Sequence, residues 1–228
     1  MITVATWNIQ KGFGTDFRRR IERTADVIES ANADLVGLQE VVRTSARDQA
    51  GYLARRLGCE LAWGPARAMR DGTYGNALLV RGRVLETRVH DLSVPRMERR
   101  ACLEALVEVR GVRVRAFVCH LGLGIRERIV QIDRVMRAME GARERGAAAR
   151  VVFGDFNEWN HGAVARAFDA EFPHVPRPGR THPSYMPLFS LDRIAWDREL
   201  DGALEVVPVR GASDHRMVRA ALRARAVS

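Results

Sequence analysis

Residues 103–119 have the sequence LEALVEVRGVRVRAFVC, and this stretch decides the class of fold. Two apolar, β-rich runs, Leu103–Val109 and Val112–Cys119, flank Arg110-Gly111, a pair that suits a tight turn. This arrangement predicts a β-hairpin with antiparallel strands. At least part of the sheet is therefore antiparallel, which argues against a purely parallel, doubly wound fold.

Short β-rich runs alternate with amphipathic segments along the rest of the chain, which predicts an α/β protein. The other predicted strands are Ile2–Trp7, Asp34–Gln39, Asn76–Val80, Val151–Phe153, Leu191–Trp196 and Met217–Leu222. Apolar residues at helical spacing predict helices over Phe17–Ala31 and Ile125–Ala142, with their apolar stripes in the core. The proline-rich stretch Glu171–Pro187 predicts a long loop.

Length and composition limit the organisation of the chain. With 228 residues, 46% of them hydrophobic, the chain can bury one sizeable core, so residues 1–228 are predicted to form one domain. No apolar run approaches the roughly 20 residues of a membrane span, and no charged-then-apolar leader is present. We therefore expect no transmembrane segment and a cytoplasmic location, and no obligate protein partner is evident. The scattered cysteines lack the paired spacing of a zinc site.

The formal charge of +9 favours anionic partners. Nucleic acid, anionic lipid and phosphorylated metabolites all qualify, because a positive field concentrates any of them near the surface. Lys11 is the only lysine, so almost all of the positive charge comes from arginine. The charge narrows the class of partner without choosing among these three.

Polar side chains lie at the ends of several predicted strands. Four of them follow an apolar run directly or within two residues: Asn8, Glu40, His120 and Asp155. In layered α/β proteins the loops beyond one edge of a sheet form a crevice, so these side chains are expected to meet there. Asp214 and His215 precede the last predicted strand, which fits the same edge if that strand runs antiparallel to the others.

The residue types in this set suit a hard divalent cation. The oxygen donors are Glu40, Asp155, Asp192 and Asp214, with the amide oxygens of Asn8 and Asn157. Such donors favour Mg²⁺ or Mn²⁺ over zinc. A cation of this kind can polarise a phosphoryl oxygen and help to generate hydroxide from water. His120, His215 and an arginine would add hydrogen bonds or positive charge to the phosphate.

Each motif taken alone also fits a structural role. Asn8 and Gly154-Asp155-Phe156-Asn157 contain residues that favour turns, and Ser213-Asp214 fits a local side-chain-to-backbone motif. Gly75-Asn76 alone is a hairpin signal. Histidines without a partner pattern are assigned to structural or surface positions: His90, His161 and His174. His182 is left open.

The ordered combination of motifs goes further than any single motif. In chain order they are Thr6-Trp7-Asn8-Ile9, Leu38-Gln39-Glu40, Tyr74-Gly75-Asn76-Ala77, Cys119-His120-Leu121, Gly154-Asp155-Phe156-Asn157, Leu191-Asp192-Arg193-Ile194 and Ser213-Asp214-His215. Together they resemble the endonuclease/exonuclease/phosphatase (DNase-I-like) superfamily over nearly the whole chain. Thr181-His182-Pro183, followed by Leu191-Asp192-Arg193-Ile194, resembles a bacterial subgroup of uncharacterised members.

This resemblance implies a four-layer α/β/β/α sandwich with two mostly antiparallel mixed sheets, and Mg²⁺ or Mn²⁺ as cofactor. It implies that Glu40 is the principal metal ligand, assisted by Asn8, with Asp214 near the ion or a second one. Asp155 and Asn157 would position the attacking water and the phosphate. His215, oriented by Asp192, would form the acid–base or phosphate-stabilising pair. The motifs do not decide whether Asp155 or the histidine activates the water.

Four further places in the sequence refine the resemblance. His120 stands where DNase-I-like nucleases, sphingomyelinases and inositol-phosphate phosphatases have histidine, whereas apurinic-site repair endonucleases tend to have tyrosine. Those repair enzymes also tend to carry an acidic residue where this chain has Gln10-Lys11-Gly12. Abasic-site repair is therefore less favoured than the other activities of the superfamily. Arg100 and Asn76 resemble residues that contact the substrate phosphate.

The resemblance implies a metal-dependent phosphoesterase that cleaves phosphodiester bonds by attack of metal-activated water, as a nuclease does. An alternative is a phosphodiesterase or phosphatase of phospholipid head groups or small metabolites, which would use the same residues. Fold-level similarity does not choose between these substrates. A non-catalytic binding module is the third alternative, and the complete set of site residues argues against it.

Overall fold

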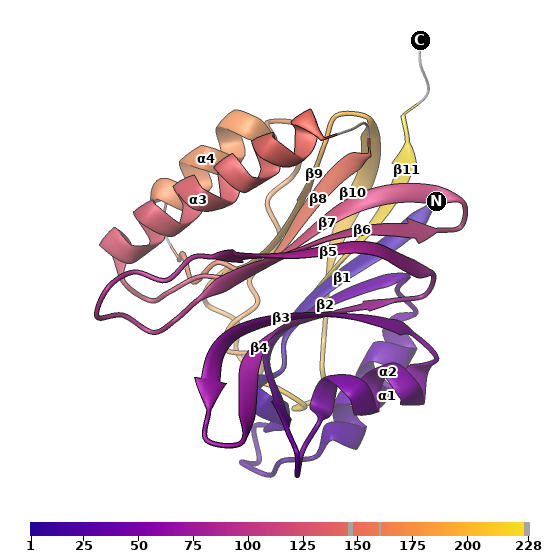
Figure 1. Cartoon of the computed structure of the whole chain (residues 1–228), viewed down its shortest axis with the longest axis vertical. Coiled ribbons are helices and arrows are strands. Elements are labelled where there is room, and N and C mark those ends of the chain that lie inside the picture. Colours follow the sequence, from indigo (N-terminus) through magenta and orange to yellow (C-terminus); the bar gives the residue numbers. More distant parts are fainter. Residues whose placement is uncertain (146–147, 160, 226–228) are drawn as a thin grey trace.

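Two β-sheets stacked face to face form the centre of the protein (Figure 1), in a computed structural model that describes residues 1–145, 148–159 and 161–225. The first sheet has the strand order β10 (Leu200–Val207), β11 (Met217–Ala224), β1 (Ile2–Asn8), β2 (Leu35–Thr44), β4 (Gly72–Val80) and β3 (Glu60–Met69). The second has the order β5 (Arg83–Asp91), β6 (Ala101–Val109), β7 (Val112–His120), β8 (Ala149–Asp155) and β9 (Asp192–Trp196).

Both sheets are mixed and mostly antiparallel. Among the paired strands only β1 with β2 and β7 with β8 run parallel. The hairpin predicted from residues 103–119 is present as β6 and β7, with Val109 paired to Val112 across the turn. The last strand, β11, runs antiparallel to β1, as the position of Asp214 and His215 required.

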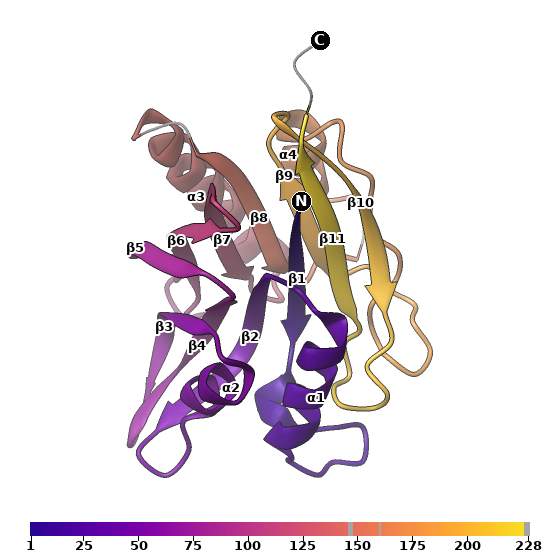
Figure 2. The same ribbon diagram turned by 90° about the vertical axis from the view of Figure 1, so that its right-hand side faces the viewer.

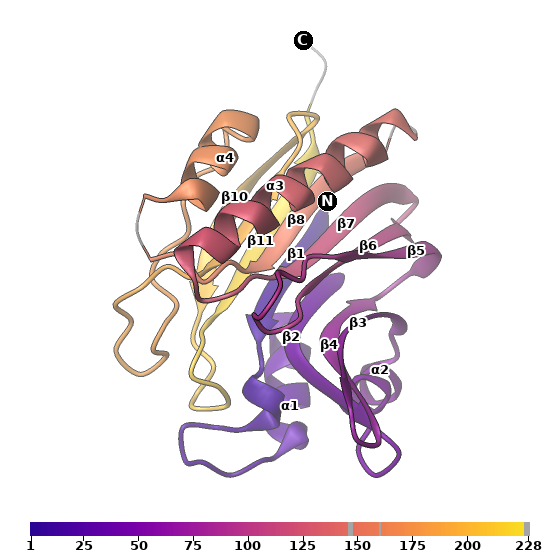
Figure 3. The same ribbon diagram turned by 60° about the vertical axis from the view of Figure 1, so that its left-hand side comes forward.

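Helices cover the outer face of each sheet (Figures 2 and 3). The helices α1 (Ile21–Ala31) and α2 (Gln49–Leu57) pack on the first sheet, and α3 (Ile125–Glu144) and α4 (Ala163–Glu171) pack on the second. The predicted α/β/β/α sandwich is therefore confirmed. No helix in the described ranges is both long enough and apolar enough to cross a membrane.

The largest apolar cluster lies between the two sheets. It is built from alternate residues of the central strands, since successive side chains of a strand point to opposite faces. Gly37 of β2 allows close approach here, because a Cβ at this position would lie 2.4 Å from the Phe153 ring of β8. The core thus holds β2 and β8, which carry two of the predicted site residues, in direct contact.

The strands missing from the sequence prediction share one property. β3, β5 and β10 each lie at the edge of a sheet, where one side of the backbone is unpaired. Edge strands carry polar and charged side chains, and those of β5 alternate between exposed and half-buried. They therefore lack the continuous apolar run that identified the central strands. The short helices α2 and α4 were also not predicted.

Three details of the prediction were wrong. Helix α1 begins at Ile21, because Phe17 has a left-handed φ of 57° and its side chain is 88% exposed. Ile125 and Ile129, placed in the apolar stripe of α3, are 61% and 48% exposed. Gly75-Asn76 lies within β4 and forms no turn.

Candidate active site

Strand direction brings the predicted site residues to one edge of the sandwich. β1, β7 and β8 carry theirs at their C-terminal ends, with His120 paired to Asp155 in the register of β7 and β8. Glu40 does not follow its strand as predicted but lies inside β2, which continues to Thr44. β9 runs antiparallel to β8, so its first residue, Asp192, pairs with Asp155. Asp214 and His215 precede β11, which is antiparallel to β1. Residues distant in sequence therefore meet where the two sheets end.

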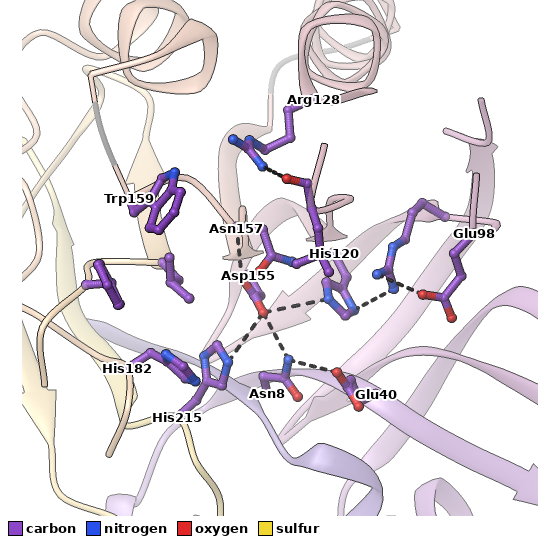
Figure 4. Close-up of a pocket in the computed structure, with 14 residues that line it drawn as sticks. Asn8, Glu40, Glu98, His120, Arg128, Asp155, Asn157, Trp159, His182 and His215 are labelled. Carbon is purple, nitrogen blue, oxygen red and sulfur yellow. Dashed lines mark hydrogen bonds and ion pairs between the residues drawn. The ribbon is translucent and has the colours of Figure 1, made fainter. Parts of the chain in front are cut away.

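The Asp155 carboxylate is the centre of the site (Figure 4). It is 1% exposed, and it accepts hydrogen bonds from the Asn8 side-chain amide (2.9 Å) and the Asn157 backbone N–H (2.9 Å). The chain reaches this position through Gly154, whose φ of 153° is reserved for glycine and whose Cβ would lie 1.9 Å from the Cys119 carbonyl oxygen. Burial raises the pKa of Asp155 to about 6, while the charge of His215 partly offsets the rise.

His215 faces Asp155 from the first sheet. Its Nδ1 lies 2.9 Å from Asp192 Oδ2, and its Nε2 lies 3.7 Å from Asp155 Oδ2. Burial opposes the charged imidazolium, but the carboxylates of Asp192 and Asp155 outweigh it and raise the pKa of His215 to about 10. At neutral pH this ring is therefore a cation that points a proton towards Asp155.

His120 faces Asp155 from the other side (Figure 4). Its Nε2 lies 3.7 Å from Asp155 Oδ2, and its Nδ1 lies 3.3 Å from Arg100 Nη1. A guanidinium only donates, so Nδ1 accepts and the proton of the neutral ring sits on Nε2. Burial, with the positive charges of Arg100 and His215, holds the pKa of His120 well below its usual value. Glu98 forms an ion pair with Arg100 and fixes the guanidinium (3.0 Å).

Glu40 lies beside Asn8 at an irregularity of β2. The register of β2 against β4 shifts between Leu38 and Val41, and Glu40 has a left-handed φ of 59°, which turns its side chain into the site. Its Oε1 lies 3.4 Å from the Asn8 amide nitrogen, and its Oε2 lies 3.1 Å from the Lys11 ammonium. The Glu40 carboxylate is therefore next to a positive charge, the Lys11 ammonium, without any bound ligand.

The remaining predicted residues are placed differently. Asp214 lies 3.8 Å from His182 Nε2, and burial would raise its pKa, but the nearby rings of His182 and His215 lower it. Asn157 donates its side-chain amide to the Leu121 carbonyl (2.9 Å), which holds its loop in place. Asn76 is buried, and its amide joins the two sheets by donating to the carbonyls of Ala101 and Val118.

A cavity of about 520 Å³ opens in front of these groups. Polar site residues line it: Asn8, Glu40, Arg100, His120, Asp155, Asn157 and His215. Four apolar residues also line it: Leu123, Trp159, Phe189 and Leu191. Asn76 and Asp214 do not line this cavity.

Sequence reasoning missed several residues of the cavity. His182 lies beside His215, with ring centroids 4.7 Å apart and ring planes tilted by 49°, although the motif Thr181-His182-Pro183 had been noted without a role. Lys11, noted as the sole lysine and within Gln10-Lys11-Gly12, contacts Glu40 next to the cavity. Trp159 is 63% exposed and follows the Asp155 motif by a few positions, where no pattern distinguishes it from a surface residue.

The chain belongs to the endonuclease/exonuclease/phosphatase family, whose family model matches residues 5–228. YbhP of Escherichia coli strain K12, described as an uncharacterised protein, is 31% identical over 236 residues, covering 93% of this chain and 92% of YbhP. The resemblance inferred from the ordered motifs, including its uncharacterised bacterial subgroup, is thus confirmed.

Solved structures share the fold at low sequence identity. The mannosyl-6-phosphatase Bt3783 of Bacteroides thetaiotaomicron has a TM-score of 0.82 at 17% identity, covering 98% of this chain and 100% of that one. Truncated TDP2 of Caenorhabditis elegans has a TM-score of 0.76 at 18% identity, covering 98% of this chain and 97% of that one. These similarities establish the four-layer architecture and leave the substrate to be argued from the site.

Proposed function

We propose that this protein is a divalent-metal-dependent hydrolase of phosphoric esters that cleaves phosphodiester bonds. The observation that carries the proposal is the environment of Asp155. A buried carboxylate with a raised pKa lies between His120 and His215, each 3.7 Å away, beside a cavity that also holds Glu40 and Arg100. Perturbed titratable groups gathered in one cavity are typical of catalytic sites.

The two perturbed pKa values assign opposite roles to Asp155 and His215. With a pKa of about 6, Asp155 is mostly ionised near neutral pH and still basic enough to accept the proton of an attacking water. With a pKa of about 10, His215 is already protonated, so it donates to a phosphoryl or leaving-group oxygen instead of acting as the base. Asp192 orients this donor through its contact with Nδ1.

His120 supplies a second donor without adding a charge. Because Arg100 fixes its Nδ1 as an acceptor, the Nε2–H points into the cavity. Arg100 is permanently charged and lines the same cavity, where it would attract the phosphate group. Donors aimed at the oxygens on which negative charge develops stabilise the transition state.

The residues around Glu40 fit a divalent cation. Glu40 and Asn8 offer hard oxygen donors, and the ammonium of Lys11, 3.1 Å from Glu40, shows that this position already accommodates a cation. We assign Glu40 as the main ligand, with Asn8 beside it. Asp214 contacts His182, and its part in binding the metal stays a prediction. Bound Mg²⁺ or Mn²⁺ would supply Lewis-acid polarisation of the phosphoryl group.

A small phosphate ester is the second candidate substrate. The cavity is within the size range of pockets for single small molecules, and the fold is shared with a protein named as a mannosyl-6-phosphatase. A phosphodiester is favoured because the apolar lining residues, among them Trp159 and Phe189, offer a surface for a second, organic substituent of the phosphate. A phosphomonoester of a sugar has no apolar group to place there.

The test is a hydrolysis panel with wild-type protein in Mg²⁺, Mn²⁺ or EDTA. The panel contains supercoiled plasmid, single-stranded DNA, RNA, bis(p-nitrophenyl) phosphate, a phosphomonoester and phospholipid vesicles. We expect metal-dependent cleavage of at least one diester, inhibited by EDTA. His215→Ala and Glu40→Ala should each abolish it.

A matched histidine control comes from the chain itself. His174 packs against Trp196 away from the cavity, so His174→Ala should keep full activity. Activity retained in a combined Glu40→Ala and His215→Ala protein would refute the proposed site. Cleavage of phosphomonoesters alone would transfer the assignment to the phosphatase alternative.

A further inference from the structure

A second pocket adjoins the active-site cavity on the outer side of β9. It has a volume of about 300 Å³, and three arginines line it: Arg177, Arg180 and Arg193. We call it the arginine pocket. None of these arginines belongs to the site described above.

Arg193 is the most unusual of the three. It follows Asp192 on β9, so its side chain points to the opposite face, and the residue is only 7% exposed. Its Nε has no hydrogen-bond partner, and within the described ranges its guanidinium forms no ion pair. The face of the Phe168 ring, with its centroid 6.0 Å from Cζ, gives a long cation–π contact but no hydrogen-bond partner. A buried cation without a partner is costly, and burial indeed lowers the pKa of Arg193.

The rest of the pocket adds positive charge around Arg193. Arg177 is held in place by Asp169 (2.6 Å) and by the His161 ring. Arg180 is exposed and makes no side-chain hydrogen bond or ion pair with the parts of the chain that the structure describes. The one carboxylate in the lining, Glu158, has both oxygens bound to backbone N–H groups at the start of α4. The pocket therefore presents free donors and no free acceptor of comparable charge.

The arginine pocket shares a wall with the active-site cavity. Trp159 lines both (Figure 4 shows its position beside the site). The segment 188–191 also separates them, because Phe189 and Leu191 line the cavity while Leu188 and Ser190 line the pocket. A ligand that leaves the phosphate site across the Trp159 face thus reaches the three arginines directly.

We propose that the arginine pocket binds a second phosphate group of the same substrate molecule, whose middle part packs against Trp159. This inference rests on the proposed function, since it takes the first phosphate to be the one that is cleaved. Arginine is the side chain best suited to phosphate, through paired N–H donors. A second phosphate separated by an organic group occurs in a nucleic-acid strand and in a bisphosphorylated metabolite.

The test compares ligand pairs that differ by one phosphate. Isothermal titration calorimetry in EDTA, where no hydrolysis occurs, would measure the affinity for each ligand. The first pair is thymidylyl-thymidine with and without a 5′-phosphate, and the second is fructose 1,6-bisphosphate and fructose 6-phosphate. We expect wild-type protein to bind the extra-phosphate member of one pair about tenfold more tightly, as charge-assisted hydrogen bonds predict. The pair that shows the preference identifies the source of the second phosphate.

Variants connect the preference to the pocket. Arg180→Gln is exposed and should fold normally, and it should reduce the preference to less than about threefold. Arg193→Gln should do the same without lowering the melting temperature, because it removes a buried cation that has no partner. Arg137→Gln, an exposed arginine of α3 paired only with Asp133, is the matched control and should keep the full preference.

Two results would overturn the inference. The first is that wild-type protein binds both members of each pair equally, or binds none of the four ligands measurably. The second is that Arg180→Gln keeps the preference for the extra phosphate. A fall in melting temperature for Arg193→Gln, with the preference intact in Arg180→Gln, would make Arg193 a structural residue. Failure of the proposed function is a separate result. It would appear as selective binding with no metal-dependent hydrolysis of any ester.

Discussion

Two buried carboxylates in the second sheet, each 1% exposed, have opposite surroundings. Glu104 of β6 forms hydrogen bonds with Arg115 (2.7 Å), Arg145 and His90 (2.6 Å). Burial alone would raise its pKa, but these three partners lower it to about 2. Glu104 is therefore a fully paired anion.

Asp155 of β8 is an anion with no such pairing. Its hydrogen-bond donors are neutral groups, the Asn8 amide and the Asn157 backbone, and its two histidines are 3.7 Å away. Burial dominates, and the pKa rises to about 6. The difference distinguishes a structural carboxylate from a functional one. The fold provides charged partners for Glu104, whereas the Asp155 carboxylate can still bind a substrate or a water molecule, or accept a proton.

The largest effect is expected for Asp155→Asn. The variant keeps the shape of the side chain but removes the proton acceptor, so kcat should fall at least about 10⁴-fold, as for other groups that act as a unit. The melting temperature in EDTA should not fall, because a poorly paired buried charge is removed. Steady-state kinetics and thermal unfolding measure the two quantities. A clear loss of stability would show that Asp155, like Glu104, stabilises the fold, and the contrast between the two carboxylates would be wrong.

Asp192→Asn should have the next largest effect. Asp192 Oδ1 has no hydrogen-bond partner among the residues that the structure describes, and Oδ2 orients His215 at 2.9 Å. An amide there no longer stabilises the imidazolium, so kcat should fall by about 10³-fold with little change in KM. The pH profile of kcat should also shift to lower pH, because the pKa of His215 falls without this carboxylate. An unchanged pH profile would contradict the assigned role.

The same comparison explains what the sequence predicted. Asp155 was found because it follows an apolar strand in a recognisable motif, and the strand directions then brought it to Asn8 and His215. Glu104 was not found from the sequence, because it lies inside a strand. Its partners are Arg115 across the hairpin and Arg145 at the end of α3. Contacts that depend on where a helix ends leave no periodic signal in the chain.

Loops limited the prediction in a similar way. Strands buried on both faces were found, including the edge strand β9, whereas the edge strands with exposed side chains, β3, β5 and β10, were missed. The loop that carries His182 was predicted only as irregular, and its path decides that His182 lies beside His215 and that Arg180 lines a pocket. Such a path follows from packing of the whole fold, and local sequence does not encode it.

Glu104→Gln should affect stability and leave activity unchanged. Removing the charge takes away the shorter of the two carboxylate contacts of Arg115, which is 6% exposed, and leaves it only Glu86 at 3.3 Å, so the free energy of unfolding should fall by about 3 kcal/mol. Glu108→Gln on the same strand is the matched control: its partner Arg113 is exposed, and the loss should stay below about 1 kcal/mol. Urea unfolding measures both. A fall in kcat for Glu104→Gln at a temperature well below melting would contradict a purely structural role.

The pH dependence of this stabilisation gives the smallest effect. The folded pKa of Glu104, about 2, lies below the ordinary glutamate pKa of 4.5, so the contribution of Glu104 to stability is complete above about pH 4.5 and is lost as the pH falls towards 2. Between about pH 7 and pH 3 the gap in unfolding free energy between wild type and Glu104→Gln should shrink by about 2 kcal/mol. Urea unfolding of both proteins at the two pH values measures it. If the difference in unfolding free energy stays constant between the two pH values, the three partners do not lower the pKa of Glu104. The contrast with Asp155 would then rest on the hydrogen-bond geometry alone.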